Sequence, residues 1–119
     1  MEKLDQEFAE KYPKIFKEYC GFNCGDGWYD IINTLCTNIQ NYIDFKHREG
    51  HPIEQVVSIE VKEKFGELRF DTKGGNEVTT AMIVMAESFA RRTCEVCGDK
   101  GKRRSGDWIQ TLCDEHASV

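Results

Sequence analysis

The sequence predicts an α+β fold in which helices pack on a β-hairpin and a small cysteine-containing module ends the chain. Three segments repeat apolar residues with the helical period, one segment alternates like a strand, and two short Cys/His pairs lie within residues 94–116. With 119 residues the chain has the length of one ordinary domain. We therefore expect an acidic α+β body of residues 1–93 with the C-terminal module, residues 94–119, packed on it.

The first two expected helices are amphipathic. Residues 4–20 carry an apolar stripe at spacings of three and four, namely Leu4, Phe8, Tyr12, Ile15, Phe16 and Tyr19. Pro13 is expected to kink or divide this helix, and the glycines of residues 21–27 end it. Asp26 is the expected N-cap of a second helix that ends before Gly50. Its apolar face consists of Trp28, Ile31, Ile32, Leu35, Cys36, Ile39, Tyr42 and Ile43.

A β-hairpin and a third helix follow. The strand pattern places Val57, Ile59, Val61, Leu68 and Phe70 on one face, which packs on helices, and charged residues on the other. The turn is expected near Phe65-Gly66. Asn76 is the expected cap of the third helix. Its apolar positions with the helical period are Val78, Met82, Met85, Ala86 and Phe89.

Composition and charge exclude several classes of protein. No stretch approaches the roughly 20 apolar residues of a membrane span, and residues 1–14 are too charged for a signal peptide. We therefore expect a cytoplasmic protein, in which six cysteines do not form a disulfide framework. Residues 1–90 carry 10 Lys and Arg against 16 Asp and Glu, a net −6, whereas residues 91–119 carry 6 against 5, a net +1. The body is acidic, and the C-terminal end has a local basic loop.

The two Cys/His pairs have the spacing of a metal site. Cys94 and Cys97 form a Cys-x2-Cys pair, and after fifteen intervening residues Cys113 and His116 form a Cys-x2-His pair. Zinc takes four nitrogen or sulfur ligands at tetrahedral corners, which two such pairs supply. We expect one structural Zn²⁺ per chain in a treble-clef or zinc-ribbon-like module. Four protein ligands leave no open coordination position, so the ion is expected to be structural rather than catalytic.

The other cysteines and the first glycine-rich segment have more than one interpretation each. Cys20, Cys24 and Cys36 pack, form a local thiol pair, or form a second metal site with His47 or His51. Cys36 and His47 lie about 16 Å apart along one helix, too far for one ion. The segment Gly25–Asp30, with Asp26, Trp28 and Tyr29 as candidate binding residues, is either a helix start that holds an anion or an N-cap followed by two aromatic packing anchors.

A basic loop is the other candidate binding surface. It consists of Lys100, Lys102, Arg103 and Arg104, preceded by Arg91 and Arg92. Nucleic acid, a phosphorylated ligand or an acidic protein are its possible partners, and a solvated turn is the alternative. Arg69, on the outer face of the hairpin, would extend this patch. We see no nucleophile–base pair and no phosphate loop, so we do not expect an enzyme. A small nuclease or hydrolase would require Asp26, His47 or His51 to converge on a second metal.

Three segments together resemble a known family. CGDGWYDII, VVSIEVKEKFGELRF and CEVCG with the later TLCDEH are similar to small zinc-knuckle proteins of bacteriophage and prophage genomes. The resemblance covers residues 20–116, and KEKFGELRF is its most specific part. Asp71 stands where the family pattern has an aromatic residue, so the resemblance is weaker at the end of the hairpin. The resemblance implies that the protein comes from a phage or prophage, and it implies no particular activity.

The resemblance and the closed metal site lead to one functional hypothesis. We expect a non-enzymatic, zinc-stabilised accessory protein of phage type that binds a host protein or a small signalling ligand in the host cytosol and counters antiviral defence. The acidic body would suit a nucleic-acid-binding target. The alternative is a nucleic-acid-binding regulator that uses the basic loop. A homodimer through the exposed hairpin edge is a further possibility.

Overall fold

The computed structural model describes residues 2–18 and 21–118, with side chains from Asp5 onward, and shows a mixed fold of helices and two small sheets. The elements in chain order are α1 (Glu2–Lys11), β1 (Phe22–Asn23), the 3-10 helix η1 (Asp26–Trp28), α2 (Tyr29–Arg48), β2 (Val57–Lys64), β3 (Glu67–Lys73), α3 (Glu77–Ala90), β4 (Lys102–Arg104), β5 (Gln110–Leu112) and α4 (Asp114–Ala117). Within the described chain, no helix combines the length and apolar character needed to cross a membrane.

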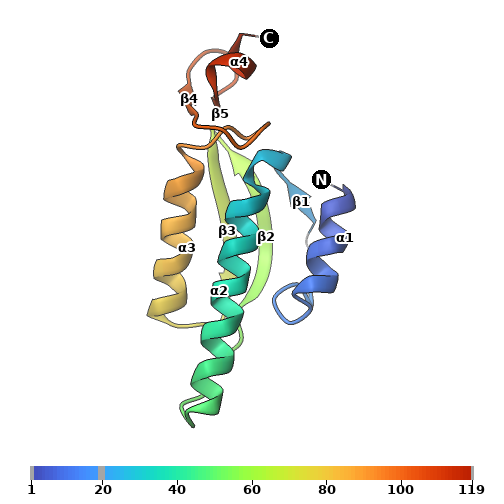
Figure 1. The fold of residues 1–119 in the computed structure, drawn as a ribbon, viewed down its shortest axis with the longest axis vertical. Coiled ribbons are helices and arrows are strands. Elements are labelled where there is room, and N and C mark those ends of the chain that lie inside the picture. Colours follow the sequence, from blue (N-terminus) through green and yellow to red (C-terminus); the bar gives the residue numbers. More distant parts are fainter. Residues whose placement is uncertain (1, 19–20, 119) are drawn as a thin grey trace.

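The helices and the first sheet form an elongated body with the second sheet at one end. The first sheet has the order β1-β2-β3, with β1 parallel to β2 and β2 antiparallel to β3. The helices α2 and α3 run side by side over the hairpin, and α1 lies by β1 (Figure 1). The β4–β5 hairpin and α4 cap the end of the long axis where α2 begins and α3 ends (Figure 1). The hairpin edge formed by β3 is one of the two outer edges of this sheet, and β1 forms the other. The dimer through the hairpin edge stays a prediction.

Helix α1 ends earlier than its apolar stripe suggests. It stops at Lys11, just before Pro13, because proline has no N–H to donate and restricts the residue before it. Ile15 and Phe16 are nevertheless buried, in turns after the helix. Phe8 stacks on Phe22 of β1 with ring centroids 5.0 Å apart. The Leu4 side chain, Tyr19 and Cys20 lie outside what the structure describes.

The buried face of α2 agrees with the sequence pattern, but its expected cap does not. Within α2, five residues of the predicted stripe are buried, namely Ile32, Leu35, Cys36, Ile39 and Ile43, and Trp28 just before the helix is buried too. Asp26 is not an N-cap. It is the exposed first residue of η1, Gly25 precedes it, and no side chain caps either helix. The N–H groups of this turn bond instead to a residue distant in sequence, as described below.

The hairpin turn lies where it was predicted, but the side chain of one strand residue, Ile59, faces the other way. Phe65 and Gly66 both have positive φ, 54° and 81°, as a two-residue hairpin turn requires. Val61 pairs with Phe70, and both are buried. Ile59 was expected on the same face but is 51% exposed. The strand register shifts between Ser58 and Glu60, and this irregularity breaks the alternation that places Ile59 inward.

Helix α3 is capped as expected but faces the core through other residues. The Asn76 side chain accepts the N–H groups of Val78 and Thr79, in a capping box. Of the predicted apolar positions only Ala86 is buried, and Met82 is partly buried. The other three of these positions, Val78, Met85 and Phe89, are exposed. The helix is apolar on most sides, so the spacing of its apolar residues did not predict which side packs against α2 and β3. The side that does so carries the small residues Ala86 and Ala90.

Candidate metal centre and its junction with the body

The four predicted metal ligands lie together. The sulfur atoms of Cys94, Cys97 and Cys113 and a ring nitrogen of His116 all lie within 4.8 Å of one another. The Cys97 and Cys113 Sγ atoms are 3.8 Å apart, and His116 Nδ1 lies 3.7 Å from Cys94 Sγ and 3.1 Å from Cys113 Sγ. Among the described residues this is the one Cys/His/carboxylate group close enough to hold a metal ion.

Local backbone structure aims each pair at the same point. The first pair lies in a tight loop in which Cys94 N–H donates to the Asp99 carbonyl and Gly98 N–H donates to the Cys94 carbonyl. Gly98 has a φ of 88°, which favours glycine. Cys113 follows β5 and is the N-cap of α4, where its Sγ accepts the His116 N–H at 3.4 Å. A loop, a two-stranded hairpin and a helical turn therefore bring the two pairs together.

The electrostatics of the cluster fit a bound cation. Burial raises the pKa of the Cys94 thiol, but the backbone N–H groups of Cys113, Cys97 and Val96 outweigh burial and bring it down to about 6. The Asp99 N–H lowers the pKa of Cys97, yet burial and the neighbouring Cys94 and Cys113 thiols raise it to about 11. The Cys94 thiol therefore loses its proton readily, whereas burial and the neighbouring thiols oppose deprotonation of Cys97. A metal ion removes that opposition because it supplies positive charge between the sulfur atoms.

No family model, no curated protein and no solved structure matches this chain in a comparison with known proteins. The contacts of its own residues therefore carry the functional argument.

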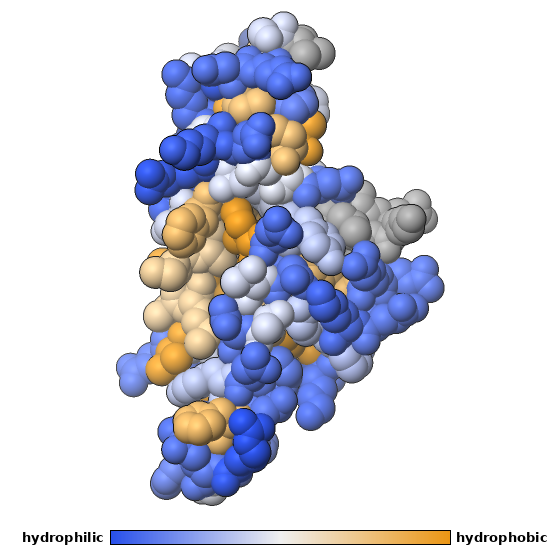
Figure 2. Space-filling view, viewed as in Figure 1, coloured by the Kyte–Doolittle hydropathy of each residue, from blue (hydrophilic) through white to orange (hydrophobic). Residues whose placement is uncertain are grey.

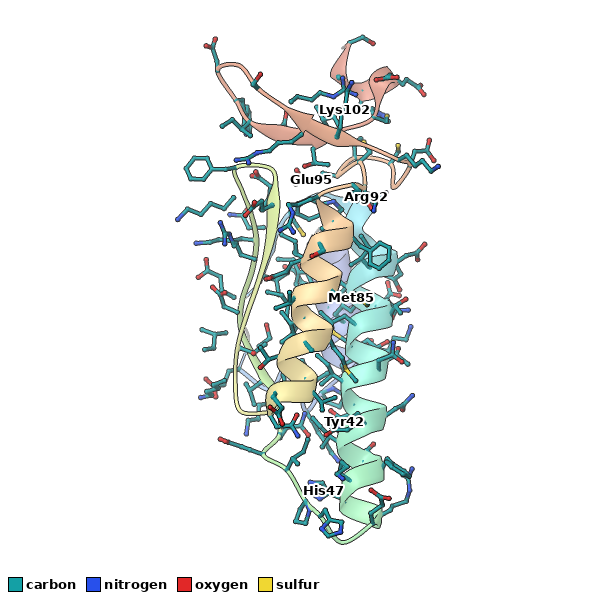
Figure 3. All side chains as sticks on the ribbon, turned by 90° about the vertical axis from the view of Figure 1, so that its left-hand side faces the viewer. Tyr42, His47, Met85, Arg92, Glu95 and Lys102 are labelled. Carbon is teal, nitrogen blue, oxygen red and sulfur yellow. The ribbon has the colours of Figure 1, made fainter. Side chains whose placement is uncertain are left out.

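Glu95, between the two cysteines of the first pair, joins the metal loop to the body. Its carboxylate Oε2 accepts the Gly25 N–H at 2.8 Å, and its carbonyl accepts the Gly27 N–H at 2.7 Å. Glu95 is buried at this junction, between the sheet and the metal module (Figure 3). The N–H groups that one interpretation of Gly25–Asp30 assigned to an anion thus bond to Glu95 of the chain itself, a carboxyl group whose pKa burial raises.

The two glycines allow this close approach. A Cβ on Gly27 would lie 2.6 Å from the Glu95 carbonyl carbon and closer still to the Cys94 carbonyl oxygen. A Cβ on Gly25 would lie 2.9 Å from the Glu95 Cγ. Real Cβ atoms do not make contacts this short, so any side chain at either position must push the metal loop away.

Trp28 and Tyr29 act as packing anchors. Trp28 is fully buried, and its indole Nε1 donates to the Thr93 carbonyl at 2.9 Å, directly before Cys94. Tyr29 donates its hydroxyl to Glu7 at 2.8 Å, which ties α2 to α1. These contacts favour the packing interpretation of the two aromatic residues.

The tip of the body hairpin makes a second contact with the metal module. Thr111 of β5 donates its buried hydroxyl to the Gly66 carbonyl at 2.6 Å. A Cβ on Gly66 would lie 3.2 Å from that hydroxyl oxygen, and its φ of 81° also favours glycine. The first glycine-rich segment, the body hairpin and the metal module thus meet at one junction. Sequence reasoning missed Glu95, Thr93 and Thr111 because no local pattern distinguishes them.

The candidate basic residues fall into two groups. Arg104 donates to the Leu112 carbonyl at 3.0 Å and to Asp114 at 2.8 Å, so it holds β5 and α4 in place. Its guanidinium lowers the pKa of Asp114. Lys100, Lys102 and Arg103 are exposed on the same module. Arg69 pairs with Glu67 at 3.0 Å within the body hairpin.

The remaining cysteines and histidines do not form a second site in the described chain. Burial raises the pKa of the Cys24 thiol to about 12, and burial also raises the pKa of Cys36. His47 lies at the end of the molecule opposite the metal cluster (Figure 3). Asp26 lies at the other end of α2, which at 20 residues spans about 30 Å, so these two side chains do not converge on one metal.

Proposed function

We propose that this chain is a non-catalytic accessory protein of phage type, stabilised by one structural zinc ion, that binds a host protein in the cytosol and thereby counters antiviral defence. The observation that carries the proposal is the exposed apolar face of α3. The phage setting rests on the sequence resemblance alone, and the zinc on the donor set.

The donor set suits zinc. Two sulfur ligands about 2.3 Å from one ion, at a tetrahedral angle, lie about 3.8 Å apart. The Cys97 and Cys113 sulfur atoms are 3.8 Å apart, and three thiolates with one imidazole form a closed tetrahedral shell. Such a shell has no position for substrate, which supports a structural ion. The order of loop, hairpin and helical turn supports a treble-clef-like module.

The apolar face of α3 has the character of a protein-binding surface. Val84, Met85 and Phe89 are 55%, 64% and 56% exposed, and Val78 is 40% exposed. They form a continuous apolar area along α3, at the left of Figure 2. A groove of about 330 Å³ lies beside them between α2 and α3, lined by Ile31, Leu35, Met82, Met85, Ala86 and Phe89 among others. Soluble proteins rarely expose such a patch unless a partner covers it.

The test replaces exposed apolar residues with glutamate on α3 and, as a control, at one exposed position of α2. The double variant Met85→Glu, Phe89→Glu should lose a host protein that the wild-type chain retains on an affinity resin. Phe45→Glu should keep it, because Phe45 is 48% exposed but lies near the far end of α2. Equal retention by both variants would refute the proposal. Self-association by light scattering, abolished by the double variant, would show instead that the face binds a second copy.

Nucleic acid is the second candidate partner. Gly101 N–H donates to the Arg92 carbonyl at 2.9 Å, and Thr93 pairs with Lys100. This pairing places Arg92 at the base of the basic loop, close to Lys102 (Figure 3). The cations that the sequence separates into two clusters thus share one end of the molecule.

Salt dependence distinguishes this candidate. Binding to a short duplex should weaken with added salt, and Arg103→Ala should reduce the slope of log K against log salt by about 1. Arg69→Ala is the control, because Arg69 is paired with Glu67 in the body hairpin. Absence of binding at low salt would exclude this function.

A further inference from the structure

A hollow of about 280 Å³ lies where the tip of the body hairpin meets the metal module. It is lined by Glu63, Phe65, Gly106, Asp107, Trp108 and Ile109. The first two belong to the body, and the other four to the loop between β4 and β5. The Thr111–Gly66 hydrogen bond holds its two walls together. The metal site and the α3 face do not use these residues.

The conformation of Phe65 is the first sign that this hollow binds something. Phe65 has a φ of 54°, the one positive φ outside glycine in the described chain. Bulky side chains rarely adopt this conformation, and hairpin turns normally use Asn, Asp or Gly there. Phe65 is also 57% exposed, so burial of its ring does not compensate for the strain. Strained residues of this kind cluster at functional sites.

Trp108 provides the second aromatic wall. It is 72% exposed, the highest fraction among the large apolar side chains described as exposed. The only other tryptophan of the chain, Trp28, is fully buried. Exposed phenylalanine from the body and exposed tryptophan from the metal module thus line one hollow. Aromatic ring faces attract cations.

The polar groups of the hollow have one sign of charge. Glu63 and Asp107 line it, and no basic side chain does. Glu63 is held in place because its Oε2 accepts the Gly66 N–H at 2.8 Å. Lys64 Nζ already lies 5.9 Å from the centroid of the Phe65 ring, so a cation of the chain itself approaches this ring. Two ring faces and two carboxylates favour an organic cation over an anion or a neutral group.

We propose that Phe65, Trp108, Glu63 and Asp107 form a binding site for an organic cation, supplied by an arginine or lysine side chain of a partner protein. The aromatic faces contact the charged group, and the carboxylates accept its N–H donors. The site goes beyond the proposed function, because it specifies a basic residue on the partner and requires nothing of the α3 face.

The experiment is a titration followed by the two indole N–H signals in a ¹H–¹⁵N spectrum. The probe is the peptide acetyl-GRGRG-amide, and its control is the same peptide with citrulline, which has nearly the same shape and no charge. The Trp108 indole and the Gly66 amide should shift with the arginine peptide and much less with the citrulline peptide. The buried Trp28 indole serves as the internal reference and should not move.

Two variants separate binding from folding. Phe65→Gly should raise the melting temperature, because glycine relieves the positive φ, and should weaken peptide binding about tenfold. Trp108→Ala should weaken binding similarly with little effect on melting. Equal shifts with both peptides, or unchanged binding by Phe65→Gly, would overturn the proposal. Tighter binding of free tetramethylammonium than of the arginine peptide would overturn the assignment to a partner side chain.

Discussion

Replacing Gly27 with alanine tests the junction between the body and the metal module. Gly27 lies in η1, where helix propensity alone would make alanine stabilising by up to about 1 kcal/mol. The added Cβ would however lie 2.6 Å from the Glu95 carbonyl carbon. The metal loop must therefore move away from the body, and the sign of the effect reverses.

The expected magnitude follows from the hydrogen bonds that cross this junction. The bonds from Gly27 to the Glu95 carbonyl and from Trp28 to the Thr93 carbonyl contribute about 1 kcal/mol each. The bond from Gly25 to the Glu95 carboxylate contributes about 1.5–3 kcal/mol, because one partner is charged. Loss of all three destabilises the protein by about 3.5–5 kcal/mol. For a chain of this length that corresponds to a melting temperature lower by roughly 15 °C.

Denaturant unfolding and the rate of metal extraction by a chelator measure the two consequences. Gly50→Ala is the control, because Gly50 has a φ of 82° and a Cβ added there would meet no other atom within 4 Å. It should destabilise by only about 1–2 kcal/mol and leave the extraction rate unchanged. If Gly27→Ala unfolds no more easily than Gly50→Ala and releases metal no faster, Gly27 does not seat the metal loop.

Three further predictions concern single contacts. Trp28→Phe leaves the Thr93 carbonyl without its indole donor and should destabilise by about 1–3 kcal/mol in urea unfolding, whereas the exposed Trp108→Phe should change stability by less than about 0.5 kcal/mol. Asn76→Ala removes the α3 capping box and should destabilise by about 1 kcal/mol, with Thr80→Ala near neutral by the same assay. Because burial raises the pKa of Cys24 to about 12, iodoacetamide at pH 8 should label Cys24 slowly in the native protein and quickly after unfolding, as mass spectrometry can show.

Local patterns predicted the features whose causes are local. The Phe65-Gly66 turn, the Asn76 cap and the buried stripe of α2 each depend on residues close in sequence. The four metal ligands form two such local pairs, and the structure brings all four together.

The missed features depend on partners far along the chain. Asp26 does not cap because Glu95, some 70 residues away, already bonds to this turn. Ile59 is exposed because of a shift in strand pairing, which no alternation of apolar residues reveals. The side of α3 that faces inward is the side on which Ala86 and Ala90 pack closely. Because the helix is apolar on most sides, the spacing of its apolar residues does not predict this side.

The arrangement of the junction gives the metal a role in binding although its coordination shell is closed. Phe65 belongs to the body and Trp108 to the metal module, so the hollow between them exists only while the module stays docked. The α3 face, in contrast, belongs to the body alone. Chelation of the metal should therefore abolish arginine-peptide binding and leave binding through α3 intact, both followed by titration on one sample. Thr111→Val should produce the same separation with the metal still bound, because it removes the hydroxyl that holds the Gly66 carbonyl. Peptide binding that survives both changes would show that the hollow does not depend on the junction.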